Sequence, residues 1–264
     1  MDNRPIGVFD SGLGGLTAVK QLEKVLPGES IIYFGDTGRV PYGSRGNDTI
    51  RRYARQDMAF LLSQNVKAVL AACGTVSSVA RSVGEALSVP FIDVIGPSAR
   101  AAAAATKNGR IGVIGTAATI ASDSYRSALL RINHKLEVFP QACPLFVPLV
   151  ESGFVAPQDE VTRLVAERYL APIRAAGVDT LILGCTHYPI IAPTIASVMG
   201  RGVTLIDSGR ALKEADLLCE EGSRRKVGYF VTDTPENFMN VAELFLGHSV
   251  EGRTQRIDIE SYPT

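Results

Sequence analysis

Residues 66–74 read Val66-Lys-Ala-Val-Leu-Ala-Ala-Cys73-Gly74, and residues 178–186 read Val178-Asp-Thr-Leu-Ile-Leu-Gly-Cys185-Thr186. Each stretch holds a short apolar run of the kind that forms a strand buried on both faces of a parallel sheet. Each run leads into a cysteine. The two stretches start 112 positions apart, which makes them candidates for equivalent strands of a duplicated unit.

Two further pairs of segments support a duplication. Ile6-Gly-Val-Phe-Asp-Ser11 resembles Ile111-Gly-Val-Ile-Gly-Thr116 at an offset of 105, and Phe91-Ile-Asp93 resembles Leu205-Ile-Asp207 at an offset of 114. Three ordered matches with slowly growing offsets indicate a repeated half. Apolar runs also alternate with helical patterns, which favours βαβ units. The sequence therefore predicts an α/β fold of two pseudo-symmetric doubly wound domains, with mainly parallel sheets and an active site in the cleft between them.

The domain boundaries are predicted where a strand end meets turn residues. Gly96-Pro97-Ser98 and Asp207-Ser208-Gly209 both have this character. We expect the chain to cross between its two halves at these points. Residues 1–96 with 207–264 then form the first domain, and residues 97–206 form the second.

Composition excludes several classes of partner. The 264 residues carry 27 Lys plus Arg and 27 Asp plus Glu, so no global positive field favours nucleic acid or an anionic membrane. No apolar stretch reaches the ~18 residues that span a bilayer, and no signal-peptide pattern precedes the first strand. These features predict a cytoplasmic protein that acts on a small molecule. In that reducing compartment the four cysteines are not expected to form disulfides.

Polar and thiol side chains gather at the predicted strand ends. In parallel sheets ligands bind at the carboxyl ends of the strands. Two related halves that face each other would bring Cys73 and Cys185 to opposite sides of one small ligand. The residues expected at this edge are Asp10, Ser11, Cys73, Thr116, Cys185 and His187.

Two opposed thiols suit one reaction in particular. Inversion of a Cα centre requires removal of a proton from one face and return of a proton to the other, so one cysteine must be a thiolate and the other a thiol. His187 lies two residues after Cys185, which in an extended segment points both side chains the same way. His187 is therefore placed to adjust the pKa of the Cys185 thiol, and Asp10 is predicted to do the same for Cys73. A single cysteine after an apolar strand is commonly only a small buried hydrophobe, and we interpret Cys143 and Cys219 in this way.

No cofactor or metal site is predicted. Gly12, Gly14 and Gly15 open a helix whose amides could hold a carboxylate, but their spacing does not match a dinucleotide fingerprint. His134 and His248 have no partner at the spacing of metal ligands.

Five motifs are spread along the chain: Gly7-Val-Phe-Asp10-Ser11-Gly-Leu-Gly-Gly-Leu-Thr17, Tyr33-Phe-Gly-Asp36-Thr-Gly-Arg-Val-Pro41-Tyr42-Gly43, Ala72-Cys73, Cys143-Pro-Leu-Phe-Val-Pro-Leu-Val-Glu151-Ser-Gly153 and Gly184-Cys185-Thr186-His187-Tyr-Pro189. Together they resemble the motifs of the glutamate racemase family over essentially the whole chain.

The resemblance implies interconversion of L- and D-glutamate without pyridoxal phosphate, supply of D-glutamate to peptidoglycan, and a homodimer. It implies that Cys73 and Cys185 are the proton donors and acceptors and that Glu151 assists His187. The remaining residues that it implies as substrate contacts are Asp10, Ser11, Pro41, Tyr42, Gly43, Thr75, Thr116, Thr119, Thr186 and His187.

One position departs from the family pattern. The family commonly reads Ala-Cys-Asn-Thr where this chain has Ala72-Cys73-Gly74-Thr75. We expect the amides of Gly74 and Thr75, or a water molecule, to hold the substrate carboxylate instead. On this view Gly74→Asn changes KM modestly and leaves kcat within about tenfold of the parent.

Other functions remain open at this point. A racemase for aspartate or another amino acid would share the fold and the thiol pair, and only pocket contacts would separate it. A cysteine-nucleophile hydrolase or decarboxylase would need one reactive thiol and an oxyanion hole. A non-catalytic amino-acid-binding protein would have no use for two opposed thiols.

The two-thiol hypothesis predicts that neither cysteine is dispensable. Cys73→Ser and Cys185→Ser should each abolish net racemisation, because a serine hydroxyl is far less acidic than a thiol. Each variant should keep a one-sided reaction, such as elimination from an analogue with a leaving group, with opposite enantiomer preference. Chiral chromatography of the products checks this, and full racemisation by either variant would rule the mechanism out.

Overall fold

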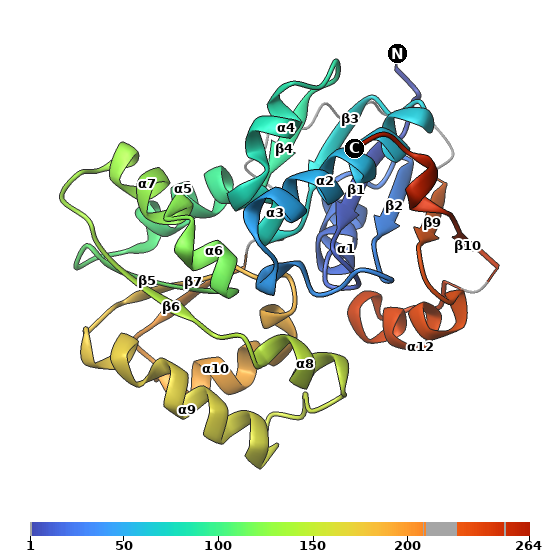
Figure 1. The fold of residues 1–264 in the computed structure, drawn as a ribbon. Helices are drawn as coiled ribbons and strands as arrows, with labels where there is room; N and C mark the ends of the chain where they lie inside the picture. Colours follow the sequence, from blue (N-terminus) through green and yellow to red (C-terminus); the bar gives the residue numbers. More distant parts are fainter. Residues whose placement is uncertain (1, 208, 210–225, 251) are drawn as a thin grey trace.

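The computed structural model describes residues 2–207, 209, 226–250 and 252–264, and they form two sheets in which all paired strands are parallel (Figure 1). The six-stranded sheet has the order β10-β9-β2-β1-β3-β4, and the four-stranded sheet has the order β6-β5-β7-β8. The predicted α/β class with mainly parallel sheets is confirmed. The strands are β1 (Ile6–Asp10), β2 (Ile31–Gly35), β3 (Ala68–Ala71), β4 (Phe91–Asp93), β5 (Arg110–Gly115), β6 (Glu137–Ala142), β7 (Thr180–Leu183), β8 (Thr204–Asp207), β9 (Val227–Val231) and β10 (Thr254–Arg256).

The sequence repeat extends to the pairing of the strands. The order β2-β1-β3-β4 in one sheet corresponds to β6-β5-β7-β8 in the other. Ile6 pairs with Ala68, and Ile111, which lies 105 positions after Ile6, pairs with Thr180, which lies 112 positions after Ala68. The two halves therefore share one strand order and one register.

Helices cover both faces of each sheet because buried side chains alternate along the strands. In β1, Val8 packs in the same apolar cluster as α1, whereas Phe9 packs in the cluster that contains α2. The six-stranded sheet lies between α1 (Leu16–Val25) with α12 (Pro235–Leu246) and α2 (Asn47–Ser63) with α3 (Gly74–Val79) and α4 (Arg81–Glu85). The four-stranded sheet lies between α5 (Ile95–Ala105) with α7 (Ser124–Ile132) and α9 (Glu160–Ala175) with α10 (Ala192–Met199).

The first predicted crossing between the halves is helical rather than a turn. Residues 96–98 lie in the first turn of α5, whose Ile95 and Gly96 amides donate to Asp93 Oδ1 at 2.8 and 3.2 Å. A proline is tolerated in a first turn because its missing amide has no partner there in any case. At the second crossing, Asp207 ends β8 and Ser208 lies outside the described residues. The division into two domains at these positions stays a prediction.

Among the described residues, none of the helices has both the length and the apolar character needed to span a bilayer.

Candidate active site

The two predicted cysteines occupy equivalent places in the two halves. Cys73 follows β3 and precedes α3, and Cys185 follows β7, the strand that corresponds to β3. The exposed fractions of these residues are 4% and 7%. Both cysteines line a single cavity of about 30 Å³ between the loops of the two sheets.

Residues from both sheets form the cavity. We call its two sides the Cys73 wall and the Cys185 wall, after the half of the chain that supplies them. The Cys73 wall consists of Ser11, Val40, Pro41, Tyr42, Gly43, Cys73, Gly74 and Thr75. The Cys185 wall consists of Thr116, Val147, Glu151, Cys185, Thr186 and His187.

Most of the predicted site residues therefore lie together. Asp10 and Thr119 lie just behind the lining, where they bond to Thr186 and Thr116. The sequence reasoning missed Val40 and Val147, because an isolated apolar residue in a loop carries no chemical signal.

Cys143 does not line this cavity. Cys143 is buried in the core beside Phe146, and its thiol donates weakly to the Gln141 carbonyl at 3.8 Å. It therefore has the predicted environment of a small core residue. Cys219 lies outside the described residues.

On the Cys185 wall, the thiol faces a histidine that is held by a carboxylate. His187 Nδ1 lies 3.9 Å from Cys185 Sγ, and His187 Nε2 lies 2.9 Å from Glu151 Oε1. Burial disfavours the imidazolium, but the hydrogen bonds and charges of Cys185 and Glu151 outweigh it and raise the pKa of His187 to about 10. At neutral pH a cation therefore lies beside this sulfur.

The backbone brings these side chains together in a different way from the one predicted. Residue 187 has φ −81° and ψ −28°, in the helical region rather than the extended one. The Tyr188 amide donates to the Cys185 carbonyl at 3.2 Å and closes a turn before the short helix Tyr188–Ile191. The contact between Cys185 and His187 is thus made within a turn.

On the Cys73 wall, the thiol is kept neutral. Burial, and next the negative charge of Asp10, raise the pKa of Cys73 to about 12. Its thiol donates to Ser11 Oγ at 3.5 Å. The two sulfurs therefore have different electrostatic surroundings: the negative charge of Asp10 acts on Cys73, and the cation of His187 lies beside Cys185.

Asp10 lies behind the lining of the cavity, where its charge acts on Cys73. Its carboxylate accepts from the Gly12 amide at 3.0 Å, from the Gly15 amide and from the Thr186 hydroxyl at 3.4 Å. The glycine amides expected to hold a ligand carboxylate thus hold this side chain. Burial raises the pKa of Asp10, and the nearby charge of His187 counteracts that rise. Asp10 acts on Cys73 through its charge, and Ser11 is the hydrogen-bond partner of the thiol.

A chain of threonine hydroxyls joins the two walls. Thr75 Oγ1 lies 2.9 Å from Thr116 Oγ1, which lies 2.9 Å from Thr119 Oγ1. Thr116 also caps the helix Ala117–Ala121 by accepting from the Thr119 amide at 3.2 Å. These hydroxyls can donate to a carboxylate of a ligand in the cavity.

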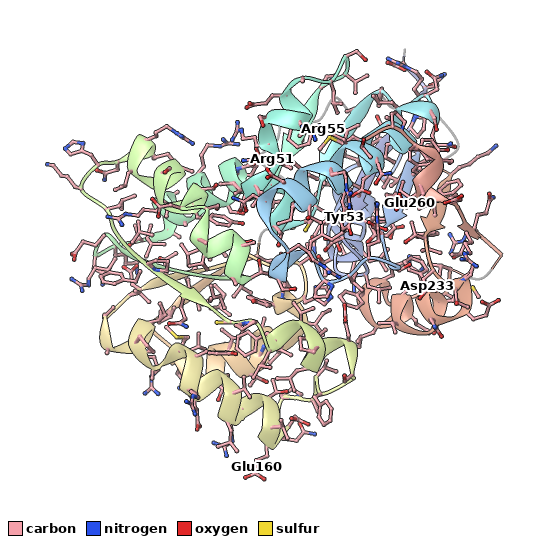
Figure 2. All side chains as sticks on the ribbon, in the orientation of Figure 1. Arg51, Tyr53, Arg55, Glu160, Asp233 and Glu260 are labelled. Atoms are coloured by element: carbon pink, nitrogen blue, oxygen red, sulfur yellow. The ribbon has the colours of Figure 1, made fainter. Side chains whose placement is uncertain are left out.

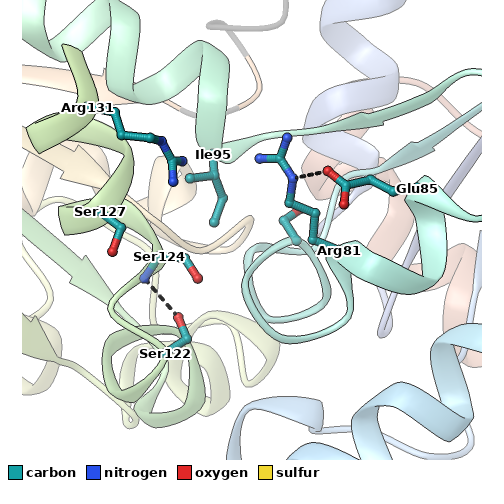
Figure 3. Close-up of a pocket in the computed structure, with 8 residues that line it drawn as sticks. Arg81, Glu85, Ile95, Ser122, Ser124, Ser127 and Arg131 are labelled. Carbon is teal, nitrogen blue, oxygen red and sulfur yellow. Dashed lines mark hydrogen bonds and ion pairs between the residues drawn. The ribbon is translucent and has the colours of Figure 1, made fainter.

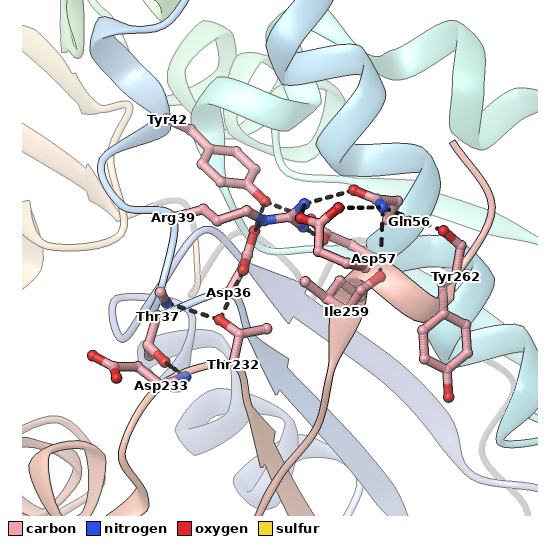
Figure 4. Close-up of polar contacts among 12 residues, drawn as sticks. Asp36, Thr37, Arg39, Tyr42, Gln56, Asp57, Thr232, Asp233, Ile259 and Tyr262 are labelled. Carbon is pink, nitrogen blue, oxygen red and sulfur yellow. Dashed lines mark hydrogen bonds and ion pairs between the residues drawn. The ribbon is translucent and has the colours of Figure 1, made fainter.

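A buried polar cluster supports the Cys73 wall from behind (Figure 4). Arg39 Nε donates to Asp36 Oδ2 at 2.6 Å, and its Nη2 donates to Asp57 Oδ1 at 3.2 Å. The Tyr42 hydroxyl bonds to both carboxylates, so it is not free to contact a ligand. Arg39 Nη1 also reaches Glu260 at 3.2 Å, which ties residues 39–42 to the C-terminal segment.

A larger cavity of about 440 Å³ lies elsewhere, and it contains neither cysteine (Figure 3). Its two arginines are Arg81 and Arg131, and Arg81 is already paired with Glu85 at 2.8 Å and Asp93 at 3.1 Å. Size alone therefore does not identify the candidate active site. Within the described part of the chain, no group of three His, Cys, Asp or Glu side chains is placed to hold a metal ion.

Comparisons with known proteins all point to one family. Residues 13–215 match the family described as Asp/Glu/Hydantoin racemase. A glutamate racemase of Chlorobaculum tepidum is 49% identical over 92% of both chains, and one of Geobacter metallireducens is 44% identical over 98% of both chains. The crystal structure of glutamate racemase from Francisella tularensis in complex with D-glutamate has a TM-score of 0.90 and 40% identity, and the match covers 99% of this chain and 100% of that chain.

The buried cluster behind the Cys73 wall predicts a large loss of stability on removal of Arg39. Arg39→Met leaves two fully buried carboxylates without their cation and should lower the free energy of unfolding by about 3–5 kcal/mol. Arg163→Met is the matched control, because Arg163 pairs with Glu167 at the same 2.6 Å but is 44% exposed. The control should lose only about 0–1 kcal/mol. Urea denaturation measures both, and equal losses would show that burial of the cluster is unimportant.

The pKa of His187 provides a second test. Glu151→Gln removes the carboxylate that stabilises the imidazolium, so the pKa of His187 should fall from about 10 by roughly 1–2 units. NMR titration of the imidazole ring measures the shift. Glu160→Gln, at the outer end of α9 (Figure 2), should leave the titration of His187 unchanged. An unchanged value in Glu151→Gln would show that the carboxylate does not hold the charge.

Proposed function

The chain belongs to the glutamate racemase family, and we propose from this premise that it interconverts L- and D-glutamate by proton transfer at Cα, without a cofactor. The observation that carries the proposal is the pair Cys73 and Cys185. They lie at equivalent positions of the repeat, on opposite walls of one cavity. Burial and the charge of Asp10 raise the pKa of Cys73 to about 12, and the cation of His187 lies beside Cys185.

The reaction requires one proton to leave Cα and another to arrive from the opposite side. The Cys185 thiolate accepts the α-proton and becomes a thiol, while the electron pair of the broken C–H bond stays on the substrate. Cys73 then gives its proton to the other face of Cα and becomes a thiolate. The opposite enantiomer reacts with the two cysteines in exchanged roles. Because burial and Asp10 disfavour charge on Cys73, we assign the acid to Cys73 and the base to Cys185 for the first of the two directions.

The cavity offers mainly neutral donors to the substrate. Among the residues that the structure describes, neither lysine nor arginine lines it, and His187 is the only basic side chain of the lining. We assign the substrate carboxylates to hydroxyls and backbone amides, each contributing about 1.5–3 kcal/mol when its acceptor is charged. We assign this role to the hydroxyls of Ser11, Thr75, Thr116 and Thr186 and to the amides of Gly74 and Thr75, all from residues that line the cavity.

The cavity must widen to admit this substrate. Its volume is only about 30 Å³. Glutamate is much larger. The walls therefore part to bind it and close to bring the two sulfurs to opposite faces of Cα.

The comparisons with relatives favour glutamate over the other candidate substrates. Proteins 44–49% identical over nearly the whole chain carry the name glutamate racemase, and one similar crystal structure contains D-glutamate. A racemase for aspartate is the second candidate, since one methylene changes affinity by only about 10–200-fold. A hydrolase or a binding protein would leave the second thiol without a role.

The cellular setting is also part of the proposal. We assign the protein to the cytoplasm, where D-glutamate is supplied for peptidoglycan. We further propose a homodimer, since large apolar side chains lie exposed around α8 (Phe146–Glu151) and α9, and such patches commonly mark interfaces. The exposed residues are Leu145, Phe154, Val161 and Leu164.

The decisive experiment incubates the purified protein with L-glutamate in deuterated water, with no added cofactor. Optical activity should disappear while deuterium enters Cα, until both enantiomers are equally populated. The parallel reaction with L-aspartate should be slower in kcat/KM by about 10–200-fold. Absence of racemisation would overturn the proposed reaction, and a hundredfold preference for aspartate would overturn the substrate.

A further inference from the structure

In the polar cluster behind the Cys73 wall, one hydroxyl lies between two carboxyl groups (Figure 4). The Tyr42 oxygen is within hydrogen-bond distance of Asp36 Oδ2, and it lies 3.0 Å from Asp57 Oδ2. Both aspartate side chains are fully buried. A phenol has one proton to donate, so it can donate to only one of these oxygens. The second carboxyl oxygen therefore needs a proton of its own, because a buried oxygen without a donor is costly.

The hydrogen-bond donors around the two carboxyl groups indicate which one is charged. Arg39 Nε donates to Asp36 Oδ2 at 2.6 Å, and the Thr232 hydroxyl donates to Asp36 Oδ1 at 2.8 Å, so both oxygens of Asp36 are acceptors. Asp57 Oδ1 accepts from Arg39 Nη2 at the longer distance of 3.2 Å. Among the hydrogen bonds of the described residues, Asp57 Oδ2 has Tyr42 as its only partner. Asp57 Oδ2 is thus the atom placed to carry the extra proton.

The charges around Asp57 act in the same direction. Burial, and next the negative charge of Asp36, raise the pKa of Asp57 well above its usual range. The cation of Arg39 and the hydrogen bond of Tyr42 lower this pKa by less, and the charge of Asp10 adds to the rise. One guanidinium balances one carboxylate. The group of Asp36, Asp57 and Arg39 is therefore neutral when one of its two carboxyl groups keeps a proton.

The Tyr42 side chain fixes a part of the cavity lining. Tyr42 begins the short helix Tyr42–Ser44, and Pro41, Tyr42 and Gly43 all line the cavity. Gly43 also touches the Cys185 wall, because a Cβ placed on it would lie 2.5 Å from Thr116 Cβ. The position of the Tyr42 ring thus determines where residues 41–43 lie relative to a ligand.

We propose that Asp57 is a positioning residue that acts as a neutral carboxylic acid. Its Oδ2–H donates to the Tyr42 oxygen, and the Tyr42 hydroxyl donates to the Asp36 carboxylate. These two directed hydrogen bonds hold Tyr42, and with it residues 41–43 of the Cys73 wall. The effect on glutamate binding rests on the proposed function, whereas the protonation state of Asp57 does not depend on it.

Asparagine at position 57 can reproduce both contacts of a neutral acid, since its Oδ1 can accept from Arg39 and its Nδ2 can donate to Tyr42. Leucine is similar in size but offers neither contact. Asp57→Leu should therefore raise KM for glutamate by about tenfold, the upper end of the effect of one neutral hydrogen bond. The change in kcat should be smaller, because both cysteines lie on other segments. Asp57→Asn should keep KM within about twofold of the parent.

Carbon-13 NMR of the aspartate carboxyl groups measures the protonation state directly. The signal that disappears in Asp57→Asn should have, in the parent at neutral pH, the chemical shift of a carboxylic acid. Asp48→Asn is the matched control, because Asp48 lies on the same helix α2 with a fully exposed side chain. The signal that disappears in this control should have the chemical shift of a carboxylate.

Each outcome decides the question. A carboxylate signal for Asp57 at neutral pH would overturn the proposal. An equal rise in KM for Asp57→Asn and Asp57→Leu would do the same, since a charge would then be required, and so would an unchanged KM for Asp57→Leu. An inactive parent would overturn the proposed function, and the NMR signal would still decide the state of Asp57. Should Asp57→Leu not fold, Tyr42→Phe removes the acceptor of the same proton and should raise KM in its place.

Discussion

The shared register of the two sheets determines where the chemistry can occur. β3 pairs with β1 as β7 pairs with β5, residue for residue. The chain therefore leaves the middle of each sheet at an equivalent point, and a cysteine follows each time. Side chains at the carboxyl ends of parallel strands project from one edge of their sheet. Because the two edges face each other, Cys73 and Cys185 lie on opposite sides of the space between them. The helices, the cap at Asp93 and the cluster around Arg39 hold these edges in place.

The surroundings of the two sulfurs differ although their positions are equivalent. Burial and the charge of Asp10 hold Cys73 as a thiol, whereas the pair of His187 and Glu151 places a cation beside Cys185. A symmetric scaffold thus places different charges beside its two thiols.

Much of this architecture could be predicted from local pattern and repetition. Apolar runs and their offsets predicted β1, β3, β4, β5, β7 and β8 as related strands and placed both cysteines at strand ends. Features that depend on through-space neighbours could not be predicted. Residues 96–98 have a turn-like composition, yet Asp93 caps them as helix, and the amides near Gly12 are occupied by Asp10. Nothing in the sequence indicates that the Tyr42 hydroxyl lies between Asp36 and Asp57, because contact between separate elements leaves no periodic signal.

The duplication within one chain has a genetic consequence. If each half were a separate identical subunit, any substitution beside one sulfur would appear beside the other, because a symmetric interface repeats every residue. Joining the halves in a single gene removes that restriction. His187 can then evolve beside one thiol while Ser11 occupies the corresponding neighbourhood of the other. The two halves can therefore acquire different side chains around their cysteines only when both halves belong to one chain.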